Sequence, residues 1–408
     1  MPNDLAAKPA APVTEEFGGR SDRAPLLGFA VDAATEATLR EGLAGALQRM
    51  PEIRRGTIHN AIAALQRGPA PSTLVVDVSG ENQPLAALED LAQVVEPDVA
   101  VLVIGDRQDM DFYRRITRGL GVREYLFKPL TAEMVARYFG SLLGGQAGSA
   151  SVLRGGRVLT VLGARPGVGA STVATNLAWY LGALESRHTV LLDPDMQTGS
   201  AALMLGVQPT PALRNALENP DRLDDLYVGR AVQSAGPRLD VLASEIALDE
   251  TIAYASGGAG RLLDMLQRRY NFIVIDLPVG QSPLLGEVCA RAHHSVLVLD
   301  PSLPAIRDTL RLLALVARTR QVCRPVLVLN RAGAPGSLSV SQVTEALQVA
   351  PDIVIPDISR RAREAELVGK PAVSLGGPMF DAIGEIALRS AGVRPIQAQR
   401  RFLRRLFG

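Results

Sequence analysis

The feature that most constrains the fold is the stretch from residue 158 to residue 181, which reads VLTVLGARPGVGASTVATNLAWYL. An apolar, β-branched run at 158–162 enters a glycine-rich turn, and apolar residues at helical spacing leave it. The pattern predicts a strand, a loop and a helix. Gly167 and Gly169 let successive backbone N–H groups point at one place, and the helix start adds partial positive charge. An anion such as a phosphate is therefore the expected occupant.

This loop departs at two positions from the common phosphate-loop motif, G-x-x-x-x-G-K-[ST]. Ala164 replaces the first glycine and Ala170 replaces the lysine, whereas Ser171 keeps the hydroxyl that the motif places on Mg²⁺. The chain has lysines only at positions 8, 128 and 370, so Arg165 is the one cation expected close to a bound phosphate. For this stretch alone, an ordinary strand-to-helix turn is the alternative.

Two later apolar segments end in carboxylates. Asp193 and Asp195 follow a predicted strand at 189–192, and Asp276 follows another at 272–275. The carboxyl ends of parallel strands form the crevice where α/β folds bind ligands. We expect Asp276 to hold Mg²⁺ through water, and Asp193 and Asp195 to position an attacking water. Each acid alone could be a turn or helix cap, but their order after the loop favours a nucleotide site.

Four segments in this order, RPGVGAST, DPDMQTG, IVIDLP and VLNR, resemble the MinD/ParA class of ATPases, whose loop reads KGGVGK[ST]T. Within that class, alanine at the P-loop lysine position together with an N-terminal receiver-like domain is similar to the CpaE/TadZ pilus-assembly proteins. The resemblance covers nearly all of the chain from about Ala24. It implies ATP and Mg²⁺ as ligands.

The resemblance also implies roles for single residues. Arg165 stands where the signature lysine of the class crosses a dimer interface, Asp195 where the water-positioning carboxylate lies, and Asn330 where an asparagine reads adenine. Pro356 is expected to wall the base, and for Asn330 a turn residue bonded to its own backbone is the alternative. The loop residues expected to bind the nucleotide are Arg165, Gly167, Val168, Gly169, Ala170, Ser171 and Thr172. Pro166 removes one N–H donor from this loop.

The predicted fold class is α/β, with two doubly wound parallel-sheet domains, because short apolar strands alternate with amphipathic helices twice along the chain. We expect strands at 27–31, 73–76, 99–104 and 124–127 in the first domain, and at 158–162, 189–192, 239–242, 272–275, 295–299, 326–329 and 353–355 in the second. The expected divisions are a disordered tail (1–24), a receiver-like domain (25–143), a linker (144–156), a P-loop domain (157–395) and a C-terminal helix (396–408).

Three residues of the first domain resemble the site of a response-regulator receiver. Asp77 stands at the phosphoacceptor position and Lys128 at the phosphate-sensing one, while Asp32 follows the first strand. The acidic pair is reduced, because Ala33 follows Asp32, and Gly105 stands where a hydroxyl is expected. A single acid makes a poor Mg²⁺ site. This favours a pseudo-receiver used for docking or dimerisation over a working phosphorylation switch.

The C-terminal residues 397–408, QAQRRFLRRLFG, predict a short helix with two unlike faces. The apolar face comprises Phe402, Leu403, Leu406 and Phe407, and the basic face comprises Arg400, Arg401, Arg404 and Arg405. Such a helix lies in a membrane interface with its arginines at anionic headgroups, and it resembles the membrane-targeting helix of MinD. Packing on the domain or on a partner is the alternative.

The net charge of +1 gives no general attraction to nucleic acid, and two cysteines fit a reducing cytoplasm. No run reaches the roughly 18 apolar residues of a spanning helix, so we expect a cytoplasmic protein that is peripheral on the inner face of the cell membrane. The expected function is an ATP-binding, dimerising organiser of type IV (tight-adherence/Flp) pilus assembly with at most slow hydrolysis, whose partners are a second copy, the pilus secretion machinery and anionic lipid. The alternatives are a non-hydrolysing scaffold of the same assembly and a ParA-like DNA-binding partitioning ATPase.

Overall fold

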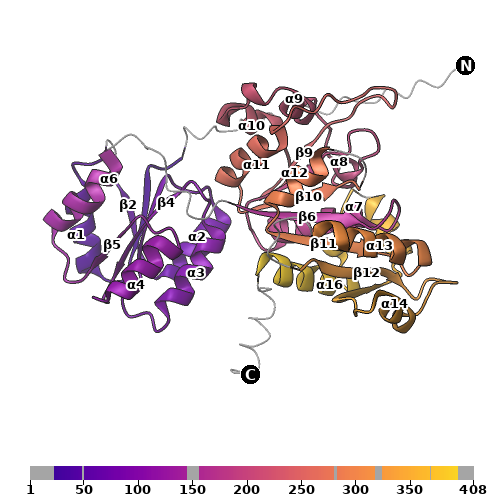
Figure 1. The fold of residues 1–408 in the computed structure, drawn as a ribbon. Coiled ribbons are helices and arrows are strands. Elements are labelled where there is room, and N and C mark those ends of the chain that lie inside the picture. The colour runs from indigo at the N-terminus through magenta and orange to yellow at the C-terminus, as the bar shows by residue number, and fades with distance from the viewer. Residues whose placement is uncertain are drawn as a thin grey trace, which may run out of the picture.

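The structure is a computed structural model that describes residues 23–47, 50–144, 156–279, 283–317, 324–367 and 369–393. The chain forms two α/β units side by side, each built on its own sheet (Figure 1). The predicted fold class is confirmed. The predicted domain limits stay a prediction, because most of the tail and linker and the whole segment 396–408 lie outside the described residues.

The first unit has a five-stranded parallel sheet in the order β2-β1-β3-β4-β5. Its strands are β1 (Leu26–Ala30), β2 (Glu52–Arg55), β3 (Thr73–Asp77), β4 (Ala100–Gly105) and β5 (Glu124–Phe127). Strands β1 and β3 are buried throughout, as expected for strands covered on both faces. The strand order reverses between β1 and β3, and ligand sites of such sheets lie at that point, beyond the carboxyl ends.

Helices cover both faces of this sheet. One core contains residues of α2 (Ile58–Arg67), α3 (Pro84–Val94) and α4 (Met110–Arg114), and the other contains residues of α1 (Ala33–Leu43) and α5 (Ala132–Val135). Helix α4 continues as the π-helical turn η2 (Arg115–Gly119), and α5 as η3 (Ala136–Gly140) and α6 (Ser141–Gly144). The result is a three-layer unit with its own two cores.

The second unit has an eight-stranded sheet in the order β13-β12-β11-β6-β10-β7-β9-β8. Its strands are β6 (Arg157–Gly163), β7 (Thr189–Asp193), β8 (Gln233–Gly236), β9 (Leu239–Ala243), β10 (Phe272–Leu277), β11 (His294–Leu299), β12 (Val326–Ala332) and β13 (Ile353–Pro356). Strand β6 is central, between β10 and β11, so the loop that follows it opens at the middle of the carboxyl edge.

The helices of this unit also form two layers. One face is covered by α7 (Ala170–Trp179), α8 (Ala201–Met204), α14 (Val340–Leu347) and α16 (Pro378–Ile386). The other is covered by α9 (Ala212–Glu218), α10 (Asp225–Ala231), α11 (Gly258–Arg269) and α12 (Pro283–Arg291). The remaining helical segments are α13 (Leu303–Val316), α15 (Ser359–Glu366), η4 (Tyr180–Leu184), η5 (Pro220–Arg222), η6 (Ala372–Leu375) and η7 (Ala387–Ala391).

Two edge strands were absent from the sequence prediction. Strand β2 reads EIRR and buries only Ile53, so it has no apolar run to mark it. Strand β8 reads QSAG and pairs antiparallel with β9, which makes the second sheet mainly, not wholly, parallel. Both are short edge strands, where burial does not require a continuous apolar sequence.

The two units contact each other at the amino ends of β7, β9 and β10, and Figure 1 shows α2 and α3 of the first unit facing this side. Arg238, just before β9, donates to the carbonyl oxygen of Gly68 at 2.9 Å and to that of Leu65, at the end of α2. Its Nη1 also lies 3.5 Å from Glu96 Oε1. Asn271, just before β10, donates to the carbonyl oxygen of Val95 at 2.7 Å.

Glu96 is the charge at the centre of this interface, and it is 7% exposed. Arg23 of the first unit and Arg238 of the second both pair with it, and His188 Nδ1 lies 3.8 Å away. Burial lowers the pKa of His188, so the imidazole is neutral at pH 7 and the two arginines carry the compensating charge. A buried carboxylate thus ties the two units together.

We expect Glu96→Gln to lower the free energy of unfolding by roughly 3 kcal/mol, because it leaves the buried guanidinium of Arg238 without a countercharge. Urea unfolding followed by circular dichroism measures this. The matched control is Glu52→Gln, which breaks the exposed pair with Arg54 and should cost under about 1 kcal/mol. Equal urea midpoints of unfolding for Glu96→Gln and Glu52→Gln would contradict a stabilising role of Glu96 between the two units.

Candidate functional site

The loop after β6 has the backbone geometry of an anion cradle. Gly167 (φ 86°) and Gly169 (φ 94°) both adopt positive φ values that side chains strain against. The N–H of Ala164 donates to the carbonyl oxygen of Val298 on β11 at 2.7 Å, which fixes where the loop begins. Helix α7 starts at Ala170 directly after the second glycine, so its free N–H groups face the loop.

Asn330 holds the loop from the neighbouring strand β12. Its Nδ2 donates to the carbonyl oxygen of Val168 at 2.8 Å, and its side chain is buried. A Cβ on Gly169 would lie 2.4 Å from that same Nδ2, so the close approach requires glycine. One N–H of the amide is therefore committed to the loop, and base recognition by Asn330 stays a prediction.

Two acids lie close to each other at the carboxyl ends of β10 and β7, and the first of them contacts α7. Asp276, at the end of β10, shares a hydrogen bond with Ser171, and burial raises its pKa to about 6. Asp193, at the end of β7, accepts from the N–H groups of Asp195 at 3.1 Å and Ala201 at 3.1 Å. Burial, with the negative charge of Asp276 nearby, raises the pKa of Asp193 to about 7. Both carboxyls are thus poised between protonation states near neutral pH.

Asp195 shapes the opposite wall of the site. Its carboxylate accepts from the N–H of Thr198 at 2.9 Å and from the hydroxyl of Thr198 at 2.6 Å. These bonds hold the residues after β7 in a turn that places Asp195 and Thr198 on the lining of the cavity. The carboxylate keeps a fixed direction, which a water-positioning group needs.

Two adjoining cavities meet at the loop. The first, of about 440 Å³, is lined by the loop glycines, Ser171, Asp195, Asp276 and Arg331. The second, of about 380 Å³, is lined by Asn330, Arg331, Ile358, Arg363 and Met379 among others. Gly169 and Thr172 line both. Pockets of this size suit small ligands. The loop glycines, Ser171 and Asp276 of the first cavity suit phosphates with a metal ion, and Ile358 and Met379 give the second cavity two apolar side chains against which a base could pack.

Pro356, predicted to wall the base, ends β13. The described lining of the second cavity begins two residues later with Ile358. The role of Pro356 therefore stays a prediction.

The donor set at the loop fits Mg²⁺. In the described part of the chain, no group of three or more His, Cys, Asp or Glu side chains is placed to hold a metal. Mg²⁺ bound with a nucleotide does not need one, because phosphates and water supply most of its six oxygens. The hydroxyl of Ser171 and the carboxylate of Asp276, already in contact, are the two protein oxygens available.

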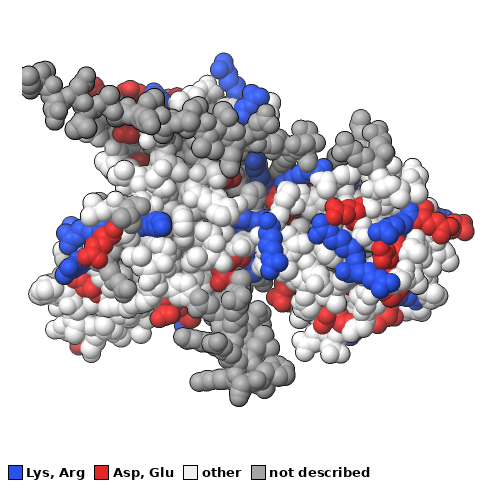
Figure 2. Space-filling model, turned by 180° about the vertical axis from the view of Figure 1, so that it is seen from behind, with Lys and Arg blue, Asp and Glu red and all other residues white. Residues whose placement is uncertain are grey.

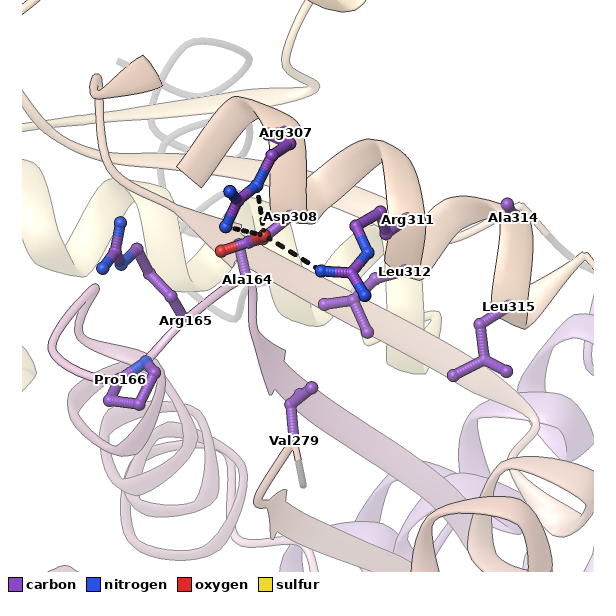
Figure 3. A pocket seen from close by; sticks show the side chains of 10 residues that line it. All are labelled: Ala164, Arg165, Pro166, Val279, Arg307, Asp308, Arg311, Leu312, Ala314 and Leu315. Carbon is purple, nitrogen blue, oxygen red and sulfur yellow. Dashed lines mark hydrogen bonds and ion pairs between the residues drawn. The ribbon is translucent and has the colours of Figure 1, made fainter. Parts of the chain in front are cut away.

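Arg165 stands at the rim of the phosphate cavity and is exposed. It also lines a neighbouring groove of about 640 Å³ against α13. Figure 3 shows Arg165 and Pro166 on one side of this groove and Asp308, flanked by Arg307 and Arg311, on the other. Among the described residues, no hydrogen bond or ion pair holds the guanidinium of Arg165, which leaves it available to an outside anion.

The predicted receiver-like residues do converge. Lys128 Nζ lies 2.6 Å from Asp32 Oδ2 and 2.8 Å from Asp77 Oδ2. Asp77 is fully buried and also accepts from the N–H groups of Val31 and Ser79. The hydrogen bond from Lys128, with that from the N–H of Thr35, lowers the pKa of Asp32 to about 2. The lysine thus pairs with both acids where a receiver would bind a metal ion.

Gly105 stands where a receiver is expected to have a hydroxyl side chain, but there is no room for a side chain at this position. A Cβ there would lie 2.6 Å from the hydroxyl oxygen of Tyr125. That hydroxyl donates to the carbonyl oxygen of Arg107 at 2.8 Å, so Tyr125 is fixed in the space. The packing of Tyr125 therefore requires glycine at position 105 in place of the hydroxyl residue of a receiver.

Comparison with known proteins bears on the second unit. No family model matches the chain. The septum site-determining protein MinD of Escherichia coli K12 is 25% identical over 284 residues, which span 62% of this chain and 99% of MinD.

Among solved structures, a ParA family ATPase from Chlorobium tepidum has a TM-score of 0.51 and 21% identity, covering 56% of this chain and 96% of that one. MinD from Pyrococcus horikoshii, complexed with Mg-ADP, has a TM-score of 0.50 and 21% identity, covering 57% of this chain and 95% of that one. The pilus assembly protein CpaE from Caulobacter crescentus is 33% identical, covering 29% of this chain and 97% of that one, with a TM-score of 0.26.

The fold and the loop define a P-loop protein with a mainly parallel sheet. The chain is similar to Escherichia coli MinD over 99% of the length of MinD, and its second unit has the fold of MinD and of ParA family ATPases.

One residue of the site was missing from the sequence prediction, which held Arg165 to be the one cation near the phosphates. Arg331 also lines the phosphate cavity. The only signal in the sequence is its place in VLNR, directly after Asn330.

We expect no Asp77-dependent phosphorylation when the protein is incubated with a small phosphodonor such as acetyl phosphate. The reason is that Lys128 already pairs with both Asp32 and Asp77, and that Ala33 stands where the second acid of a metal-binding pair is expected. A phosphate-affinity gel of the parent and of Asp77→Ala measures this. A shifted band in the parent that disappears in Asp77→Ala would refute it.

Proposed function

We propose that this protein is an ATP-binding, dimerising, membrane-associated organiser of type IV pilus assembly, with at most slow ATP hydrolysis. The observation that carries the proposal is the cavity in which the glycine loop, the Ser171–Asp276 pair and Asp195 converge. The adjoining cavity with Ile358 and Met379 on its walls offers a place for the base.

Each residue of the site has a defined task in this proposal. The loop N–H groups, fixed by Gly167, Gly169 and Asn330, bind phosphate oxygens. Ser171 and Asp276 hold Mg²⁺, which neutralises charge on the phosphates when bound. Asp193 accepts from the N–H of Asp195 and so holds the turn that aims the Asp195 carboxylate at a water.

Slow hydrolysis follows from the missing lysine. Catalysis of phosphoryl transfer rests on positioning and on charges aimed at the phosphates. Ala170 supplies no charge, so the positioning groups remain while one stabilising cation of the usual loop is lost. If the protein binds ATP without hydrolysing it, it is the non-hydrolysing scaffold instead.

The pilus role and the membrane role rest on the sequence. Alanine at position 170 together with a receiver-like first unit is what resembles the pilus-assembly proteins, and the basic amphipathic segment 400–407 lies outside the described residues. In the described chain, every helix is too short or too polar to span a bilayer. Membrane association in this proposal is therefore peripheral and comes from the C-terminal segment.

The DNA-binding alternative has less support. On the face seen in Figure 2, Lys and Arg side chains lie interspersed with Asp and Glu side chains over both units. The net charge is +1. Nonspecific DNA binding needs a concentrated basic surface.

We expect Asp276→Ala to lose the Mg²⁺-dependent part of ATP affinity, at least about tenfold, or about 1.4 kcal/mol. Isothermal titration with ATP, with and without Mg²⁺, measures it. In the parent, this Mg²⁺-dependent part should be full at pH 8 and fade as the pH falls below about 6, because protonated Asp276 cannot hold the metal and bound Mg²⁺ competes with the proton.

The control for this experiment is Asp221→Ala, which removes an exposed carboxylate of η5 that does not line either cavity as described. Its titration should match that of the parent. A parent that binds no ATP, or an Asp276→Ala variant that binds like the parent with Mg²⁺, contradicts the proposed site.

We expect Arg165→Ala to weaken ATP-dependent dimerisation and liposome recovery together, because an unpaired arginine at the rim of the site can reach a partner's phosphates. In the dimer, two copies of the C-terminal segment would bind lipid together. Phe402→Glu should abolish liposome recovery and leave the dimer unchanged. Analytical ultracentrifugation and liposome sedimentation with and without ATP separate these effects. If Arg165→Ala dimerises with ATP as well as the parent does, Arg165 does not bind the nucleotide of the partner subunit.

A further inference from the structure

Strand β12 carries an irregularity beside the phosphate loop. The pairing of β12 with β13 shifts register between Leu329 and Ala332. Arg331, inside this shift, has a φ of 57°. Left-handed backbone is uncommon for a residue with a side chain, and such residues cluster at functional sites. Bulges of this kind redirect side chains next to active sites.

The bulge gives two consecutive residues two different tasks. Asn330 is buried and donates to the carbonyl oxygen of Val168. Arg331 is exposed and lines both the phosphate cavity and the cavity proposed for the base. In a regular strand, successive side chains point to opposite faces of the sheet, so the left-handed residue is what brings the guanidinium to the junction of the two cavities.

The guanidinium of Arg331 is available to a ligand. In the part of the chain that the structure describes, no hydrogen bond or ion pair to it is found. The acid that feels its charge is Asp357, whose pKa is lowered mainly by hydrogen bonds from Ser359 and further by the charges of Arg331 and Arg363. Asp357 Oδ1 is already taken by the N–H and hydroxyl of Ser359.

We propose that Arg331 binds the nucleotide phosphates in place of the lysine missing at position 170. The inference rests on the proposed ATP site. Arg331 reaches the phosphates from β12 of the same chain, whereas Arg165 at the outer rim is left for a partner. Arg331 lines both cavities, so in this proposal it lies where the phosphate chain joins the nucleoside. It therefore contacts phosphates that ATP and ADP share. The hydrogen bonds from a guanidinium to a phosphate are charge-assisted and can be bidentate.

The test is isothermal titration of the full chain with Mg-ATP and with Mg-ADP. Arg331→Asn removes the charge while asparagine tolerates the left-handed backbone. We expect it to weaken both nucleotides by a similar factor of about ten or more. The matched control is Arg360→Ala, which removes an exposed cation of α15 that is not among the described lining residues of either cavity, and it should change either affinity by less than about threefold.

A second variant separates charge from structure. Ala170→Lys in the Arg331→Asn background returns a cation to the usual position of the loop, so affinity for both nucleotides should recover. A role of Arg331 in packing alone would give no recovery, and that result overturns the inference. It is likewise overturned if the parent binds nucleotide and Arg331→Asn binds equally well. If the parent binds neither nucleotide, the proposed function itself fails.

Discussion

The hydrogen bond from Asn330 to the carbonyl oxygen of Val168 is the contact on which the site depends. It ties the phosphate loop, which follows β6, to β12, a strand two places away in the sheet. The bond requires glycine at 169, and the left-handed glycine in turn sets the direction in which α7 begins. Ser171 on that helix then meets Asp276. One amide therefore fixes the loop, the helix start and the hydroxyl at the metal position.

The same strands connect this site to the first unit. Strands β7 and β10 carry Asp193 and Asp276 near their carboxyl ends, and the residues just before these strands, His188 and Asn271, lie at the interface with the first unit. The receiver-like unit thus sits at the amino edge of the sheet, opposite the site. Its acids Asp32 and Asp77 both pair with Lys128. These contacts favour a fixed structural partner of the P-loop unit over a detachable switch.

The sequence predicted what local patterns encode. Buried strands such as β6 and β10 are continuous apolar runs, and the loop and its acids follow them directly, so their meeting at one sheet edge could be expected. Strand β2 could not be predicted from the sequence, because only one residue of EIRR is buried and there is no apolar run. The direction of Arg331 depends on a bulge and a left-handed backbone that no local pattern announces. The contact of Asn271 with Val95 joins residues 176 positions apart, which periodicity cannot reveal.

The most direct test of the account is a crystal structure of the full chain with Mg²⁺ and a non-hydrolysable ATP analogue. The account predicts phosphates in the loop at 164–171, the metal between Ser171 and Asp276, and the base between Ile358 and Met379. It is contradicted if the analogue, at saturating concentration, is absent from the loop or binds elsewhere on the protein.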